Sequence, residues 1–261
     1  MADENQIDIR EAWNRISPCY QQKSNIPTAF VHYGPHCPNE DQLQLIGDVR
    51  GKRVLEIGCG GAQCSIAFAK RGAIATGIDL SDEQIEFARR LARSEGVEAA
   101  FMQGNIEDLS PIPDASQDVV FSAYALGYVE RLDRCFAGVV RVLRRGALFV
   151  FSVAHPFWHC LAEEKLPELR IETSYNAREP EEWNWEYEGT SLRARVRAHR
   201  HTVGDWFRLL LGAGLEVLDI LEPEPVESGS GQDWGGYYSP ERQRMAPATI
   251  IWKARKSPKS C

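Results

Sequence analysis

The most informative part of the sequence is a glycine-rich stretch that follows an apolar run. The stretch VLEIGCGGAQCS, from Val54 to Ser65, places an acid, Glu56, just ahead of Gly58 and Gly60. Glycines at this spacing let a backbone approach a bound ligand closely. Dinucleotides, nucleoside triphosphates and sulfonium nucleosides are all bound by loops of this kind, so the chemistry depends on which of the three fits.

Two of these ligand classes require residues that the loop lacks. A triphosphate loop requires a lysine followed by serine or threonine after the glycines, and this loop has no lysine. A dinucleotide loop requires glycine or alanine at the last position of G-x-G-x-x-G, where this chain has Gln63. The charge of Glu56 would also oppose a pyrophosphate. The same charge would favour a cationic ligand.

The pattern acid-x-Gly-x-Gly-x-small resembles the first motif of the class I S-adenosylmethionine-dependent methyltransferases, with Ala62 where that family more often has glycine. The resemblance implies S-adenosylmethionine as cofactor and S-adenosylhomocysteine as its product. Further along, GIDLS places Asp79 and Leu80 at the end of the next β-rich run, about 20 residues beyond the loop. In the family, the acid at this place accepts hydrogen bonds from both ribose hydroxyls, and Leu80 beside it is expected to contact the cofactor.

Three further stretches extend the resemblance over most of the chain from about residue 51, and it is closest to the small-molecule subfamily sometimes called type 11. MQGNIEDL is similar to a motif whose acid holds the adenine amino group; here Asn105 must accept that bond through its carbonyl, and Ile106 would cover one adenine face. DVVFSAYALGYV is similar to the fourth-strand motif, whose end, Ser122 to Tyr124, would face the methionine portion. VLRRGALFVFS matches the next turn, with Arg-Gly-Ala where the family usually has Pro-Gly-Gly.

Two tyrosines near the N-terminus complete the expected cofactor site. AWNRISPCYQQ resembles the family's N-terminal helix, which implies that Tyr20 closes over the cofactor. VHYGPHCPNE precedes the core in many relatives, and Tyr33 within it would reach the methionine carboxylate. Hydrophobic packing with an exposed hydroxyl is the alternative interpretation of both tyrosines.

Histidines supply the candidates for acid-base chemistry. SVAHPFWHC places His155 just beyond a β-rich run, at the edge where open α/β sheets bind ligands, so His155 is the candidate general base. A buried histidine that satisfies a backbone group is the alternative. His159 and Cys160 lack the acid of H-E-x-x-H, and no metal site is expected. His199 and His201 are similar to an HRT element in relatives, where an orienting or a capping role would fit.

The elements that must position these residues alternate along the chain. Short β-rich runs such as RVLEIG, AIATGIDL, DVVFSAY and ALFVFSVAH are separated by helical patterns. Such alternation requires crossover connections and a parallel sheet buried on both faces. We therefore predict an α/β, Rossmann-like, doubly wound fold: a mostly parallel seven-stranded sheet with an antiparallel edge strand and an inserted lid.

The same patterns divide the chain into four parts. We expect an N-terminal helical cap at 1–50, a cofactor-binding α/β core at 51–155, a lid covering the acceptor site at 156–201, and the C-terminal part of the core sheet at 202–261. Within the lid, EEWNWEYEGTS places Trp183, Trp185 and Tyr187 at alternating positions, so on a strand they would share one face. That face would serve either core packing or the stacking of an aromatic acceptor.

Composition narrows the partners and the compartment. The formal net charge of -7 and the pI of about 5.5 disfavour a nucleic-acid groove, which needs a clustered basic footprint. The seven cysteines are scattered without a Cys-x-x-Cys pair, which argues against a disulfide framework and fits a reducing cytoplasm. The polar N-terminus and the lack of a long apolar run predict a protein without an export signal or a membrane partner.

The function expected from these features is methyl transfer from S-adenosylmethionine to an oxygen or nitrogen of a small-molecule acceptor by in-line displacement. Because the sulfonium methyl is already activated, alignment of the acceptor is the main requirement, and alignment is worth up to roughly 7–11 kcal/mol. Two alternatives stay open at this point: a carbon methyltransferase of the quinone type, and a non-catalytic regulator that binds S-adenosylmethionine.

Overall fold

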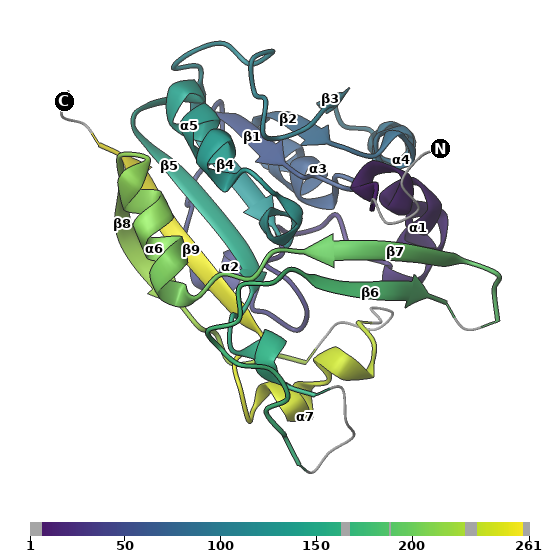
Figure 1. Cartoon of the computed structure of the whole chain (residues 1–261). Helices are drawn as coiled ribbons and strands as arrows, with labels where there is room; N and C mark the ends of the chain where they lie inside the picture. Colours follow the sequence, from purple (N-terminus) through teal and green to yellow (C-terminus); the bar gives the residue numbers. More distant parts are fainter. Residues whose placement is uncertain (1–6, 163–167, 188, 228–233, 258–261) are drawn as a thin grey trace, which may run out of the picture.

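The computed structural model describes residues 7–162, 168–187, 189–227 and 234–257. A seven-stranded sheet with the order β3-β2-β1-β4-β5-β9-β8 runs through the centre of the molecule (Figure 1). Its strands are β1 (Arg53–Ile57), β2 (Ile74–Asp79), β3 (Ala100–Gln103), β4 (Gln117–Ala123), β5 (Leu143–Ala154), β8 (Leu215–Leu221) and β9 (Thr249–Lys256). β1 to β5 pair in parallel, whereas β9 runs antiparallel to both β5 and β8. The predicted fold class is confirmed, with the antiparallel strand lying next to the edge strand β8.

Helices cover both faces of this sheet, as the crossover connections require. They are α1 (Ile9–Ser24), α2 (Glu40–Leu43), α3 (Gln63–Lys70), α4 (Asp82–Ser94), α5 (Leu132–Val142), α6 (Val203–Gly212) and α7 (Pro240–Gln243). Successive side chains of a strand point to opposite faces, so Phe149 and Phe151 pack with Trp206 of α6 while Val150 packs with Phe68 of α3. No helix in the described ranges is both long enough and apolar enough to span a bilayer.

Local sequence signals account for the ends of the helices near the sheet's carboxyl edge. The hydroxyl of Ser81 accepts a hydrogen bond from the backbone N–H of Gln84 and so caps the N-terminus of α4. Thr202 and Asp205 form a reciprocal capping box at the start of α6. These caps fix where each helix begins relative to the strand ends.

A two-stranded antiparallel hairpin, β6 (Glu181–Glu186) and β7 (Arg193–Ala198), lies apart from the main sheet and packs on α1 (Figure 1). Trp183 and Trp185 share one face of β6, and the residues that alternate with them along the strand are exposed. That face meets the aromatic side of α1, where the rings of Trp13 and Trp185 lie 5.4 Å apart. The hairpin therefore holds α1 in place over the core.

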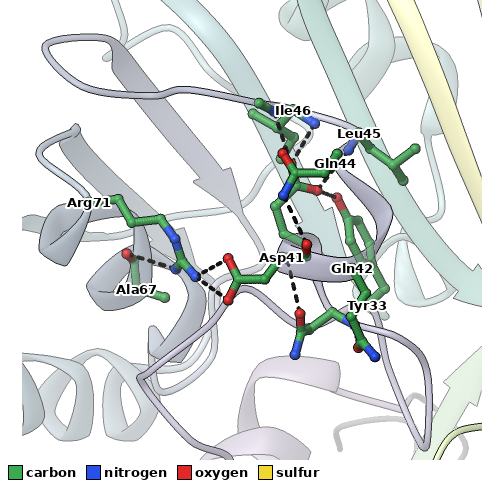
Figure 2. A network of polar contacts seen from close by, with 11 residues as sticks. Tyr33, Asp41, Gln42, Gln44, Leu45, Ile46, Ala67 and Arg71 are labelled. Carbon is green, nitrogen blue, oxygen red and sulfur yellow. Dashed lines mark hydrogen bonds and ion pairs between the residues drawn. The ribbon is translucent and has the colours of Figure 1, made fainter.

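One buried carboxylate fixes the segment between α1 and β1. Glu40 accepts a hydrogen bond from the hydroxyl of Tyr33 at 2.6 Å and others from the backbone N–H groups of Leu45, Ile46 and Gly47 at 3.1, 2.7 and 3.0 Å. Figure 2 shows Tyr33, Leu45 and Ile46 in this network. Hydrogen bonds to an ionised acceptor contribute more than neutral ones, and buried N–H groups left without a partner are costly. Glu40 thus organises a loop that has little regular structure.

We predict that Glu40→Ala lowers the free energy of unfolding by about 3 kcal/mol, because it leaves buried donors unpaired. The neighbouring Asp41 forms a largely exposed ion pair with Arg71 (Figure 2), so the control Asp41→Ala should cost about 1 kcal/mol or less. Denaturant unfolding of both variants measures the difference. Equal losses would contradict the role of Glu40.

Candidate functional site

A pocket of about 300 Å³ lies at the edge of the sheet where β1, β2 and β4 end. Its walls come from six separate segments of the chain, including α1 and the glycine-rich loop after β1. Eight of the residues that the sequence singled out line it: Tyr20, Glu56, Gly58, Gly60, Asp79, Leu80, Asn105 and Ile106. The pocket therefore brings together residues that lie far apart in the sequence.

Asp79 connects the end of β2 to the glycine-rich loop. One oxygen of its carboxylate accepts a hydrogen bond from the backbone N–H of Gly60 at 2.8 Å, and the other accepts one from Ser81 at 2.9 Å. Burial raises the pKa of Asp79, and these backbone donors oppose that rise. A carboxylate held in this way keeps free lone pairs on both oxygens for hydroxyl groups of a ligand.

The glycine-rich loop requires its glycines for two separate reasons. Gly58 has a φ of +67°, and a Cβ added to it would lie 2.1 Å from the Cβ of Ala125. Gly60 also lies in the left-handed region, but a Cβ added to it would lie 3.9 Å from its nearest neighbour, the side chain of Gln84. Gly58 thus permits close packing against the segment after β4, and Gly60 leaves the loop backbone accessible.

Glu56 places a second carboxylate in the pocket. It accepts hydrogen bonds from the backbone N–H and the hydroxyl of Ser65 at 2.7 and 2.5 Å. Burial raises the pKa of Glu56 to about 8, with a further contribution from the charge of Asp79. A cation bound near Glu56 would favour its ionised form, so the pocket suits a positively charged ligand better than a pyrophosphate.

Three buried glutamines join α1 to the helices beside the pocket, and sequence reasoning missed them. The amide of Gln21 donates to Gln84 at 2.7 Å and accepts from Gln63 at 2.6 Å. The partners lie 63 and 42 residues apart, so no local pattern could have paired them. A Cβ added to Gly61 would lie 2.6 Å from the Gln21 amide nitrogen, which shows how closely α1 covers the loop.

Asn105 and Ile106 follow β3 and form another part of the wall. The carbonyl oxygen of Asn105 accepts a hydrogen bond from the backbone N–H of Glu107 at 2.9 Å, which fixes the side chain in an Asx turn. Ile106 is buried and belongs to the main core cluster. The turn thus presents a preset amide and an apolar surface to the pocket.

Aromatic side chains form the wall opposite the glycine-rich loop. Trp13, Tyr20 and Tyr128 line the pocket, and Trp13 contacts both tyrosines edge to face at 5.7 and 5.5 Å. Trp183 and Trp185 of the hairpin pack behind these rings rather than in the pocket. The aromatic face expected in the lid therefore supports the wall from outside.

The structure places the candidate base His155 outside this pocket. Its Nδ1 accepts a hydrogen bond from the backbone N–H of Phe157 at 3.0 Å, so its Nε2 carries the proton toward Glu222 at 2.7 Å. Burial lowers the pKa of His155, and Glu222 opposes that shift. The candidate base His155 therefore lies outside the pocket, and both of its ring nitrogens are used in hydrogen bonds within the fold.

Two predicted cofactor contacts also lie elsewhere. Tyr33 is fully buried against Phe121 in the core, and its hydroxyl donates to Glu40, so it does not reach a ligand. Ser122 is fully buried too, because on β4 its side chain points into the core while the next residues, Ala123 and Tyr124, line the pocket. Both side chains are therefore buried in the packed interior of the fold.

A larger groove of about 870 Å³ between α5 and α6 contains none of the glycine-loop residues. It is lined by a mixture of arginines, histidines and aspartates, and His199 borders both this groove and the pocket. Among the described residues, no group of three or more histidine, cysteine, aspartate or glutamate side chains could hold a metal ion. The smaller pocket, which contains the glycine-loop residues, is therefore the candidate site.

Comparisons with known proteins agree with this choice. Residues 55–151 match the family described as a methyltransferase domain. The fatty-acid O-methyltransferase of Mycolicibacterium smegmatis is 41% identical over 111 residues, which are 42% of this chain and 39% of that protein. The demethylmenaquinone methyltransferase of Tropheryma whipplei is 28% identical over 151 residues, 57% of this chain and 60% of that protein. The match thus spans less than two thirds of the length of either relative.

Among solved structures, an S-adenosylmethionine-dependent methyltransferase from Mesorhizobium loti superimposes with a TM-score of 0.66 and 25% sequence identity. The alignment covers 82% of this chain and 95% of that one. It therefore extends well beyond the residues that match the domain family.

We predict that Gly58→Ala destabilises the fold more than Gly96→Ala. Both residues have nearly the same φ, +67° and +66°, but nothing lies within 4 Å of a Cβ added to Gly96. Gly96→Ala should cost about 1 kcal/mol for the left-handed conformation alone. Gly58→Ala should cost about 1–3 kcal/mol more because it collides with Ala125. Denaturant unfolding of the two variants tests this, and equal costs would show that the close approach is unimportant.

Proposed function

We propose that this chain, whose residues 55–151 match a methyltransferase domain family, transfers a methyl group from S-adenosylmethionine to an oxygen or nitrogen of a small-molecule acceptor. The observation that carries the proposal is the Asp79 carboxylate hydrogen-bonded to the N–H of Gly60. It joins a hydroxyl-binding acid to a glycine-rich loop that has a second acid, Glu56, behind it. Carbon methylation of the quinone type, and binding without transfer, are the alternatives.

The residues of the pocket fit this cofactor chemically. Asp79 and Leu80 would hold the ribose, and Asn105 and Ile106 would hold the adenine ring. Glu56 would face the positive charge of the methionine portion, since burial of an acid is best compensated by a cation. The donors and acceptors of the site thus match a cationic nucleoside.

The chain's own part in the reaction is to align the acceptor and to exclude water. The sulfonium, when bound, supplies an activated methyl group. The aromatic wall of Trp13, Tyr20 and Tyr128 keeps water from the site, and the glutamine contacts hold α1 closed over the loop. Relatives named for fatty-acid and demethylmenaquinone methylation support a small molecule as acceptor, as does the net charge of -7.

Isothermal titration calorimetry with S-adenosylhomocysteine tests the proposal. We predict binding of S-adenosylhomocysteine and no comparable binding of NAD. Asp79→Ala should weaken S-adenosylhomocysteine binding by roughly 1.5–3 kcal/mol, the scale of hydrogen bonds to a charged group. Because Asp79 also holds Gly60 and Ser81, the variant is measured at a temperature where it is folded. An unchanged dissociation constant, or NAD binding of similar strength, would overturn the assignment.

We also predict that cofactor binding is linked to the release of a proton from Glu56. Its pKa in the free protein is about 8, and a bound cation favours the ionised form and so lowers that pKa. Below pH 8 binding should therefore release a proton, about one at pH 7, and affinity should rise as the pH approaches 8.

Calorimetry in buffers of different ionisation enthalpy measures this proton directly. Glu56→Gln, which cannot ionise, should bind S-adenosylhomocysteine without the release. Proton release that persists in Glu56→Gln would assign the titration to another group.

A further inference from the structure

His32 occupies a position that the proposed function has not yet used. In the sequence VHY, Val31 and Tyr33 are both 0% exposed in the core, while the side chain between them, that of His32, lines the pocket. The backbone on either side is fixed: the carbonyl of Val31 accepts from the N–H of Glu40 at 3.0 Å, and that of His32 accepts from the thiol of Cys64 at 3.7 Å. The imidazole is therefore held by the fold rather than by a flexible loop.

The ring of His32 has a buried nitrogen that forms no hydrogen bond among the described residues. Its Nδ1 is closed off from solvent and has no hydrogen-bond partner among the described residues, and the same holds for Nε1 of Trp234, whose ring lies 6.2 Å away. Most buried polar atoms have a partner, so such atoms need an explanation. Burial lowers the pKa of His32 to about 4, which keeps the imidazole uncharged at neutral pH.

His32 lies on the β4 side of the glycine-rich loop. The acid Asp79 ends β2, and Asn105 follows β3, both on the other side of β1. The segment of His32 packs toward β4, where the flanking Tyr33 contacts Phe121. His32 therefore lines the pocket away from the positions proposed for the adenine and the ribose, near the end proposed for the transferable methyl group.

The tyrosines that line the pocket are poorly suited to accept a proton. The hydroxyl of Tyr124 is bonded to Thr249 at 2.6 Å and lies 3.2 Å from the carbonyl of Ala248. Burial raises the pKa of Tyr20 and of Tyr128, so neither ionises readily. An uncharged imidazole, by contrast, has one nitrogen lone pair available.

We propose that His32 is the general base of the methyl transfer and that the acceptor is a phenol. This rests on the proposed function. A lone pair of the phenolic oxygen forms the bond to the methyl carbon as the carbon–sulfur bond breaks and its electron pair stays on sulfur. The phenolic proton passes to the unprotonated nitrogen of His32. An oxygen that is gaining a methyl group becomes strongly acidic, so a weakly basic imidazole suffices.

The rings around His32 favour a phenol over an aliphatic alcohol or a carboxylic acid. Tyr20, Tyr124 and Tyr128 line the same pocket and offer flat apolar faces to an aromatic acceptor. A carboxylate has no proton to lose, so it would not need a general base such as His32. The chemistry of the site thus matches a neutral aromatic hydroxyl group.

The test uses the whole protein loaded with S-adenosylhomocysteine, with phenol, catechol and 4-methylcatechol as probes. Histidine-labelled protein should show the ring signal of His32 moving when a probe binds, and His32→Ala should bind the probes at least about tenfold more weakly. His32→Gln keeps a hydrogen-bond acceptor, so it should hold affinity within about threefold. With labelled S-adenosylmethionine, both variants should lose turnover by about 100-fold or more, because neither has a base.

The control is His159→Asn, since His159 bonds Glu181 outside the pocket and its replacement should leave probe binding and turnover unchanged. Turnover by His32→Ala within about threefold of the wild type would overturn the role of His32. Binding of none of the three probes to the wild type would overturn the phenolic acceptor. Failure of the wild type to bind S-adenosylhomocysteine would instead overturn the proposed function on which this inference depends.

Discussion

The hydrogen bond from the N–H of Gly60 to the carboxylate of Asp79 is the contact on which the rest of the site depends. Two parallel strands bring their ends to the same edge, but this 2.8 Å contact sets the distance between the loop after β1 and the acid after β2. Burial would favour protonation of Asp79, and two backbone donors counter it. The acid is thus held in place before any ligand arrives, which reduces the ordering cost of binding.

Polar contacts between distant segments close the pocket around this centre. Gln21 of α1 reaches both Gln63 and Gln84, and Glu40 fixes the loop that carries His32. The hairpin β6–β7 packs its tryptophans against α1 from outside (Figure 1). Helix α1 therefore lines the pocket, and the hairpin β6–β7 keeps α1 in position.

The sequence predicts the sheet and half of the site because strand alternation and glycine spacing are local signals. Glu56, Gly58 and Asp79 could be located from their places at strand ends. Tyr33 and His155 lie outside the pocket, since their types suit a ligand but their positions turn them toward Glu40 and Glu222. The glutamine contacts depend on pairs more than 40 residues apart, which no single-sequence pattern reports. For His32 the sequence does carry a local signal: it stands between Val31 and Tyr33, so in an extended segment its side chain points away from theirs.

Hydrogen exchange with and without S-adenosylhomocysteine tests most directly where the cofactor binds. If the glycine-rich loop, the end of β2 and the covering helix form the site, backbone amides in 58–63, 79–84 and 9–24 should exchange more slowly in the complex, because the ligand holds α1 against the loop. The groove between α5 and α6 should be unchanged. Protection confined to that groove, with none in the glycine-rich loop, would contradict the account.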